Sequence, residues 1–92
     1  MAMYKFYSII KWESEDNVFS VEFPDVPNCF TDGKILKEAI ENAEDALGLL
    51  LSVLEDDGKD IPAPSPAKDI QVPEDANLIL IDVETDNFKE AV

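Results

Sequence analysis

The sequence predicts an α+β domain in which one amphipathic helix covers one face of a small sheet, in the element order β-β-β-α-β. Three observations lead to this fold class. The first third of the chain carries short segments of alternating apolar and polar residues, separated by turn formers, which is typical of strands. Residues 34–57 carry the apolar spacing of a helix. Residues 77–84, NLILIDVE, form a further apolar run of strand length.

The first two predicted strands form a hairpin. Residues 3–12, MYKFYSIIKW, place an aromatic stripe on one face, and residues 17–23, NVFSVEF, alternate again after the polar turn ESEDN. Tyr7 and Ile9 fall on the other face, between two lysines. Because a half-apolar open face commonly marks an interaction site, these two residues are candidates for self-association, with an ordinary amphipathic surface as the alternative.

The segment PDVPNCFTDG, residues 24–33, predicts a rigid turn followed by a short strand and the start of the helix. Pro24 cannot donate a ladder hydrogen bond, so the second strand ends there or lies at an edge. Asn28 tolerates a positive φ better than most residues other than glycine. The third strand is expected at residues 29–31, with Gly33 turning the chain into the helix.

The helix predicted for residues 34–57 has an apolar stripe that widens toward its end. Most of its acidic residues lie in the first half, where the helix dipole favours them. Leu49, Leu51 and Val53 broaden the stripe, which predicts deeper burial or a partner for the second half. Gly58 is the expected stop. The stripe itself consists of Leu36, Ala39, Ile40, Ala43, Leu47, Leu50 and Leu54.

Four prolines between residues 62 and 73 predict an extended connection. The strand at residues 77–84 is expected to be buried on both faces at its start. A right-handed crossover would place it parallel to the first or third strand. Thr85 or Asp86 is expected to cap a short helical turn.

Length and charge narrow the functional classes. The 92 residues predict a single domain, residues 1–92, and the formal net charge is −14, from 21 acidic residues and 7 lysines without Arg or His. Phosphate binding needs Lys or Arg, so the sequence predicts no direct contact with nucleic acid. An acidic surface suits a basic partner, whereas solubility alone is the alternative explanation of the charge.

Catalytic and cofactor sites are not expected. Cys29 is the single cysteine and the chain has no His to act as its base, so nucleophilic catalysis lacks a partner group. The acids show neither calcium-loop spacing nor a pair on one strand, and there is no glycine-rich phosphate loop. We therefore predict no enzyme activity, no metal and no cofactor. Without a signal peptide or a long apolar span, a cytoplasmic location away from membranes is expected.

Two stretches of the chain together form a specific combination of motifs: VEFPDVPNCFTDGKILKEAIENAEDALGLLL and, after it, DDGKDIPAPS. This combination resembles the HicB-like antitoxin family, and the resemblance runs from about residue 4 to residue 84. The family turn is represented by Phe23, Pro24, Asp25, Val26, Pro27, Asn28 and Cys29, followed by Thr31 and Gly33. The helix contributes Glu38, Ala39, Asn42 and Ala43, and the segment after it contributes Gly58, Ile61, Pro62, Pro64 and Ser65.

The resemblance implies a partial RNase H-like β-β-β-α-β domain without nuclease chemistry. It also implies an antitoxin that neutralises a small basic HicA-like mRNA interferase by covering its active site and RNA surface, and that forms a homo-oligomer. The acids proposed for contact with that toxin are Asp25, Asp32, Glu38 and Glu41. The alternative is a stand-alone oligomeric scaffold or small-ligand-binding protein of the same fold.

The sequence departs from the family pattern at two points. Asn28 stands where the family usually has Gly, and this substitution fits a positive-φ position. Many members also carry a C-terminal DNA-binding domain, whereas nothing after residue 84 is long or basic enough to enter a groove. A short form without this domain is therefore expected, with a truncated form of a longer chain as the alternative.

Overall fold

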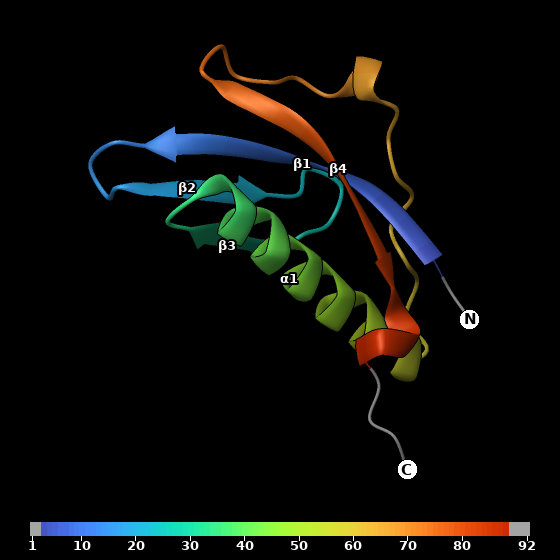
Figure 1. Ribbon diagram of the computed structural model, residues 1–92. Coiled ribbons are helices and arrows are strands. Elements are labelled where there is room, and N and C mark those ends of the chain that lie inside the picture. The colour runs from blue at the N-terminus through green and yellow to red at the C-terminus, as the bar shows by residue number, and fades with distance from the viewer. Residues whose placement is uncertain (1–2, 89–92) are drawn as a thin grey trace.

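The computed structural model describes residues 3–88 and confirms the α+β class, with one helix packed against a four-stranded sheet (Figure 1). The hairpin, the single long helix and the last strand lie where the sequence predicts them, within a few residues at each end. In chain order the elements are β1 (Met3–Glu13), β2 (Val18–Glu22), β3 (Phe30–Gly33), α1 (Leu36–Asp56), the 3₁₀ turn η1 (Ala67–Asp69), β4 (Ala76–Glu84) and the 3₁₀ turn η2 (Thr85–Phe88).

The sheet has the order β3-β2-β1-β4, and every neighbouring pair is antiparallel. The predicted parallel direction of the last strand is therefore wrong. In Figure 1, α1 carries the chain back along the sheet, and the linker, residues 57–75, then crosses the sheet once more before β4 begins. This additional pass reverses β4, so that Met3 lies opposite Glu84 and Lys11 lies opposite Ala76.

The core lies between α1 and one face of the sheet. From the strands, Phe6, Ile10 and Ile81 are each 1% exposed, and from the helix Leu47 and Leu51 are fully buried. Small residues on α1, such as the fully buried Ala39 and Ala43, let the helix approach the sheet closely. Ser8 also points to this side and satisfies its hydroxyl by donating to the Ile79 carbonyl, at 2.9 Å.

Glycine is required at two points of close approach to α1. A Cβ at Gly33 would overlap the backbone of Ala39, so β3 can meet the start of the helix only with Gly there. A Cβ at Gly48 would overlap the ring of Phe88, which packs η2 onto the middle of the helix. The predicted stop at Gly58 is confirmed: its φ is +67°, and Lys59 N–H donates to the Leu54 carbonyl at 2.9 Å.

The other face of the sheet differs from the sequence-based expectation. The start of β4 is not buried on both sides, because Asn77 is exposed and Leu78 is only half-buried. At the centre of the strand, Leu80 is 45% exposed on the face opposite the helix. The second half of α1 is not buried throughout either, since Leu49 and Val53 are exposed. The sequence shows that these positions are apolar, but it does not show which of these side chains are left uncovered by the rest of the fold.

Among residues 3–88, no helix is both long enough and apolar enough to cross a membrane.

Candidate partner-binding site

The turn between β2 and β3 is a closed loop. Phe23 N–H donates to the Cys29 carbonyl at 3.2 Å, and Val26 N–H donates to the Phe23 carbonyl at 3.2 Å. Asn28 has the positive φ that the sequence predicts, +65°. Val26 and Cys29 point into the core, whereas Pro24 and Pro27 remain exposed. These contacts give the family turn a structural role, and its two prolines lie on the surface.

Asp25 ties this loop to the linker after the helix. Its two carboxylate oxygens accept hydrogen bonds from Ser65, from the backbone N–H at 2.7 Å and from the hydroxyl at 2.8 Å. The two residues are 40 positions apart and come from the two separate motifs of the resemblance. The sequence predicts neither contact, because nothing local relates the segments. In this fold, Asp25 serves to hold the linker.

Cys29 is a buried thiol. Its side chain belongs to the core beneath α1, and burial raises its pKa to about 11. A thiol that is protonated at neutral pH is a poor nucleophile. The geometry therefore makes Cys29 a packing residue.

The other predicted acidic contacts lie around the start of α1. Glu38 accepts a hydrogen bond from Lys34 N–H at 3.1 Å, and its side chain is exposed. The Asp32 carbonyl accepts from Asn42 Nδ2 at 2.8 Å, which leaves the exposed Asp32 carboxylate for solvent or a partner. Glu41 is exposed on the helix.

These four acids are not one cluster. Asp25 lies in the loop before β3, whereas Asp32 lies at the far end of that strand, near the helix start. Only Asp32, Glu38 and Glu41 share one end of the molecule. A partner contacting this end would meet three carboxylates without touching Asp25.

The structure adds a row of exposed residues that the sequence reasoning did not assemble. Glu41, Asp45, Leu49 and Val53 follow one another at four-residue intervals on α1, and all four are exposed. Residues spaced in this way stack on one side of a helix. Leu49 is 57% exposed and Val53 is 45% exposed, which is unusual for two neighbouring apolar side chains. We call these four residues the α1 outer row; its signal in the sequence is the four-residue spacing outside the core stripe.

The sheet face opposite α1 carries the residues predicted for self-association. Tyr7 is half-buried, whereas Ile9 is only 6% exposed and therefore offers little surface to a partner. Ile9 lines a groove of about 380 Å³ together with Ser20, Phe30 and Pro73 of the linker. The position of Pro73 shows that the linker passes over this face. The alternation of residues along β1, from which the sequence predicts the open face, contains no information on the course of the linker.

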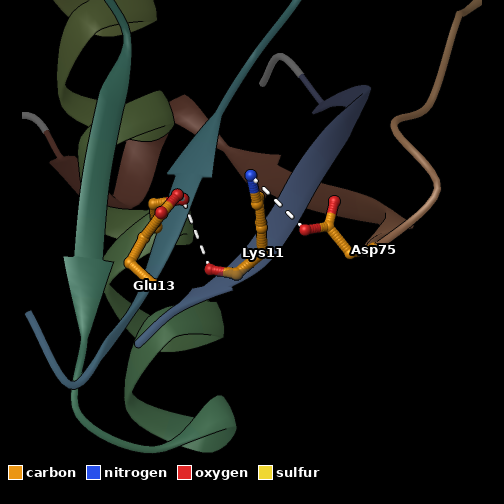
Figure 2. A network of polar contacts seen from close by, with 4 residues as sticks. Lys11, Glu13 and Asp75 are labelled. Atoms are coloured by element: carbon orange, nitrogen blue, oxygen red, sulfur yellow. Dashed lines mark hydrogen bonds and ion pairs between the residues drawn. The ribbon is translucent and has the colours of Figure 1, made fainter. Parts of the chain in front are cut away.

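Figure 2 shows the polar contacts beside this groove. Lys11 Nζ lies 3.5 Å from Asp75 Oδ2, which joins β1 to the end of the linker. The Ser20 hydroxyl donates to Glu13 Oε2 at 2.9 Å and lies 3.3 Å from the Lys11 carbonyl. Within residues 3–88, no group of three or more His, Cys, Asp or Glu side chains could hold a metal ion.

The fold of this chain is similar to that of solved components of toxin-antitoxin complexes. Its structure superposes on a chain of a toxin-antitoxin complex from Streptococcus pneumoniae with a TM-score of 0.88, at 14% identity over 98% of this chain and 75% of that one. It also superposes on a chain of the HicA3 and HicB3 toxin-antitoxin complex with a TM-score of 0.63, at 28% identity over 88% of this chain and 96% of that one. The α+β fold is thus that of known toxin-antitoxin components.

The sequence comparisons give the family. Residues 6–92 match the family described as HicB-like antitoxin of bacterial toxin-antitoxin systems, and the chain belongs to this family. It is 36% identical over 56 residues to the UPF0150 protein Ta0767 of Thermoplasma acidophilum, covering 61% of this chain and 81% of that protein. It is also 36% identical over 56 residues to Antitoxin HicB 2 of Photorhabdus laumondii, covering 61% of this chain and 40% of that antitoxin. The alignment therefore spans less than half the length of that relative.

Proposed function

We propose that this chain neutralises a small basic toxin of the HicA type by binding over its active site and RNA-binding surface. The observation that carries the proposal is the α1 outer row, in which two carboxylates lead into two exposed apolar side chains. Family membership and the resemblance to chains of toxin-antitoxin complexes support it. A net charge of −14 supports it further, since a basic RNA-binding surface complements this charge.

Each half of the row has its own part in the proposal. Glu41 and Asp45, with Glu38 and Asp32 nearby, steer the basic partner and compete with RNA phosphates for its cationic groups. Leu49 and Val53 supply the apolar contact that slows dissociation. Of the acids named from the sequence, Asp25 has the smallest part, because its carboxylate oxygens already accept two hydrogen bonds from Ser65.

The test measures toxin binding and RNA cleavage together. The chain is co-purified with the small basic protein encoded beside it, and the Kd is measured at about 0.05 M and about 0.5 M salt. We expect a complex that weakens with salt and RNA cleavage that stops when the chain is added in equal amount. A basic neighbour that cleaves RNA undisturbed by an excess of this chain would contradict the proposal.

Matched variants locate the contact. Leu49→Ser with Val53→Ser removes apolar contact without altering charge, and Phe30→Ser on the other sheet face is the control, since Phe30 is 72% exposed. The double variant is expected to raise the toxin Kd at least about tenfold, which corresponds to about 1.4 kcal/mol. The control should bind the toxin with the Kd of the unaltered chain. An equal rise of the Kd in both variants would contradict a contact through α1.

A further inference from the structure

The turn between β1 and β2 is a well-defined and strongly acidic end of the sheet. Asp16 N–H donates to the Glu13 carbonyl at 3.2 Å, and Asn17 closes the turn with a φ of +54°. Glu15 and Asp16 are exposed there, and residues 13–17, ESEDN, contain no lysine. The turn therefore holds a local excess of negative charge at a fixed place.

Trp12 is the last large apolar residue of β1 before this turn, and it lies on the face of the sheet that α1 covers. It is 43% exposed, whereas Ile10, two residues earlier on the same face, is 1% exposed. The core beneath α1 thus ends before Trp12. Exposed tryptophan is notable because this residue type is enriched among those that dominate the binding energy of protein interfaces.

Phe19 holds the indole ring of Trp12. The two residues are directly opposite in the β1–β2 ladder, with ring centroids 4.9 Å apart and ring planes at 62°. In such an edge-to-face contact the edge of one ring meets the face of the other, so at least one face of the indole stays uncovered by Phe19. Trp12 therefore presents an aromatic face in a fixed orientation beside the acidic turn.

We propose that Trp12 binds a cationic side chain, an arginine or a lysine, of a basic protein partner, with Glu15 and Asp16 beside the bound cation. A cation over the face of an aromatic ring is attracted by the ring quadrupole, and among aromatic residues tryptophan attracts it most strongly. The neighbouring carboxylates raise the local concentration of cationic groups. The identity of the partner rests on the proposed function, whereas the cation site itself does not.

Charge favours this occupant over others. A nucleic-acid base would also stack on an indole, but its phosphates would meet the carboxylates of the turn. A second copy of the chain would bring a second acidic turn and a net charge of −14. The start of α1 is less selective for cations, because Lys34 and Lys37 there offset Asp32 and Glu38.

One small partner can contact Trp12 and the α1 outer row together. Trp12, Phe19 and Gly33 are neighbours across three adjacent strands, and α1 begins shortly after Gly33. In Figure 1 the β1–β2 turn and the start of α1 lie at the same end of the molecule. α1 has 21 residues and is therefore roughly 30 Å long, the diameter of a small domain. Trp12 would thus anchor one end of an interface whose apolar contact, Leu49 and Val53, lies further along the helix.

The first experiment follows the fluorescence of Trp12, which is the single tryptophan of the chain. The full chain is titrated with an oligoarginine peptide at about 0.05 M and about 0.5 M salt. We expect the emission of Trp12 to change at low salt and to change less at high salt, with no response to an oligoglutamate peptide. Emission that stays constant throughout the oligoarginine titration would overturn the proposal. Emission that changes with the concentration of the chain alone would also overturn it, because a second copy would then cover Trp12.

Variants test the same contact in the complex with the small basic protein encoded beside this chain. Trp12→Leu keeps an apolar side chain but removes the ring, and it should raise the Kd about three- to tenfold. Trp12→Phe should have an intermediate Kd. Phe30→Leu, a similar change at an exposed aromatic residue of the other sheet face, is the matched control and should leave the Kd unchanged. Thermal unfolding checks that each variant keeps its fold.

Fluorinated tryptophan separates the attraction of a cation from the burial of an apolar surface. Expression of this chain with mono-, di- or trifluorotryptophan alters position 12 only, and each fluorine withdraws electrons from the ring face while the shape of the ring is nearly kept. The Kd should rise with each added fluorine. A Kd that is indifferent to fluorination, or equal in Trp12→Leu and in the unaltered chain, would overturn the proposal. The absence of any complex with the unaltered chain would instead contradict the proposed function, and the oligoarginine titration would then decide on the cation site by itself.

Discussion

The two faces of the sheet are covered in different ways. On one face, α1 inserts Leu47 and Leu51 among strand residues that include Phe6, so the buried contact is mainly apolar. At its end, the Tyr4 hydroxyl of β1 donates to Glu55 of α1 at 2.7 Å. On the other face, the linker passes over Ile9 with Pro73 and is held by the pair Asp25–Ser65 and by Lys11–Asp75. The first face depends on packing and the second on a few polar contacts. The stability of the domain should therefore be concentrated on the helix side.

The largest expected effect is on the helix side. Phe6→Ala removes a ring that is 1% exposed and should lower the free energy of unfolding by about 3–5 kcal/mol, a large part of what a small domain has. Leu80→Ala, the counterpart on the open face, should cost less than about 1 kcal/mol in the monomer. Urea unfolding at low salt and low protein concentration measures both. Similar losses would mean that the open face is packed as tightly as the helix side.

An intermediate effect is expected where the linker is tied down. Asp25→Ala removes the acceptor of both Ser65 hydrogen bonds and should lower the free energy of unfolding by about 1–2 kcal/mol, because Asp25 is half-buried and charged. Ser65→Ala removes one of the two bonds, so its loss should be smaller. The double variant should cost less than the sum of the two single losses. Additive losses would show that the pair does not hold the linker.

The effect that is smallest at neutral pH concerns Cys29, in the core on the helix side. The folded state raises the pKa of this thiol from 9.0 to about 11, because burial disfavours the thiolate. The folded protein thus holds the thiol proton more tightly than the unfolded chain does. The contribution of this group is intact below pH 9 and is lost as the pH rises toward 11.

The measurement compares the pH dependence of stability in the unaltered chain and in Cys29→Ala. Lysine and tyrosine side chains titrate in the same range, so only the difference between the two curves reports on the thiol. The unaltered chain should lose stability more steeply than the variant between pH 9 and pH 11. Parallel curves would contradict the assigned burial.

What the sequence predicts well in this protein is local. The alternation in residues 3–12 and the spacing along α1 each depend on a single element, and the positive φ of Asn28 depends on one turn. The direction of β4 is not local, because it depends on how often the linker crosses the sheet. The burial of Ile9 and the exposure of Leu80 depend in turn on where that linker lies. The four-residue spacing of the α1 outer row can be read from the sequence, whereas the exposure of its side chains can be seen only in the structure, where α1 is packed on the sheet.

The reversed direction of β4 also determines how the domain responds to a mechanical pull. Met3, the first residue of β1, and Glu84, the last residue of β4, are cross-strand neighbours. A force that pulls Met3 and Glu84 apart therefore acts on the same end of the β1–β4 ladder. The hydrogen bonds of this ladder run perpendicular to the strands, so under such a force they would break one after another from that end. A parallel β4 would have to shear all of them at once. Once the contact between Phe88 and Gly48 is broken, the force needed to separate β1 from β4, the longest strand pair, is expected to be low.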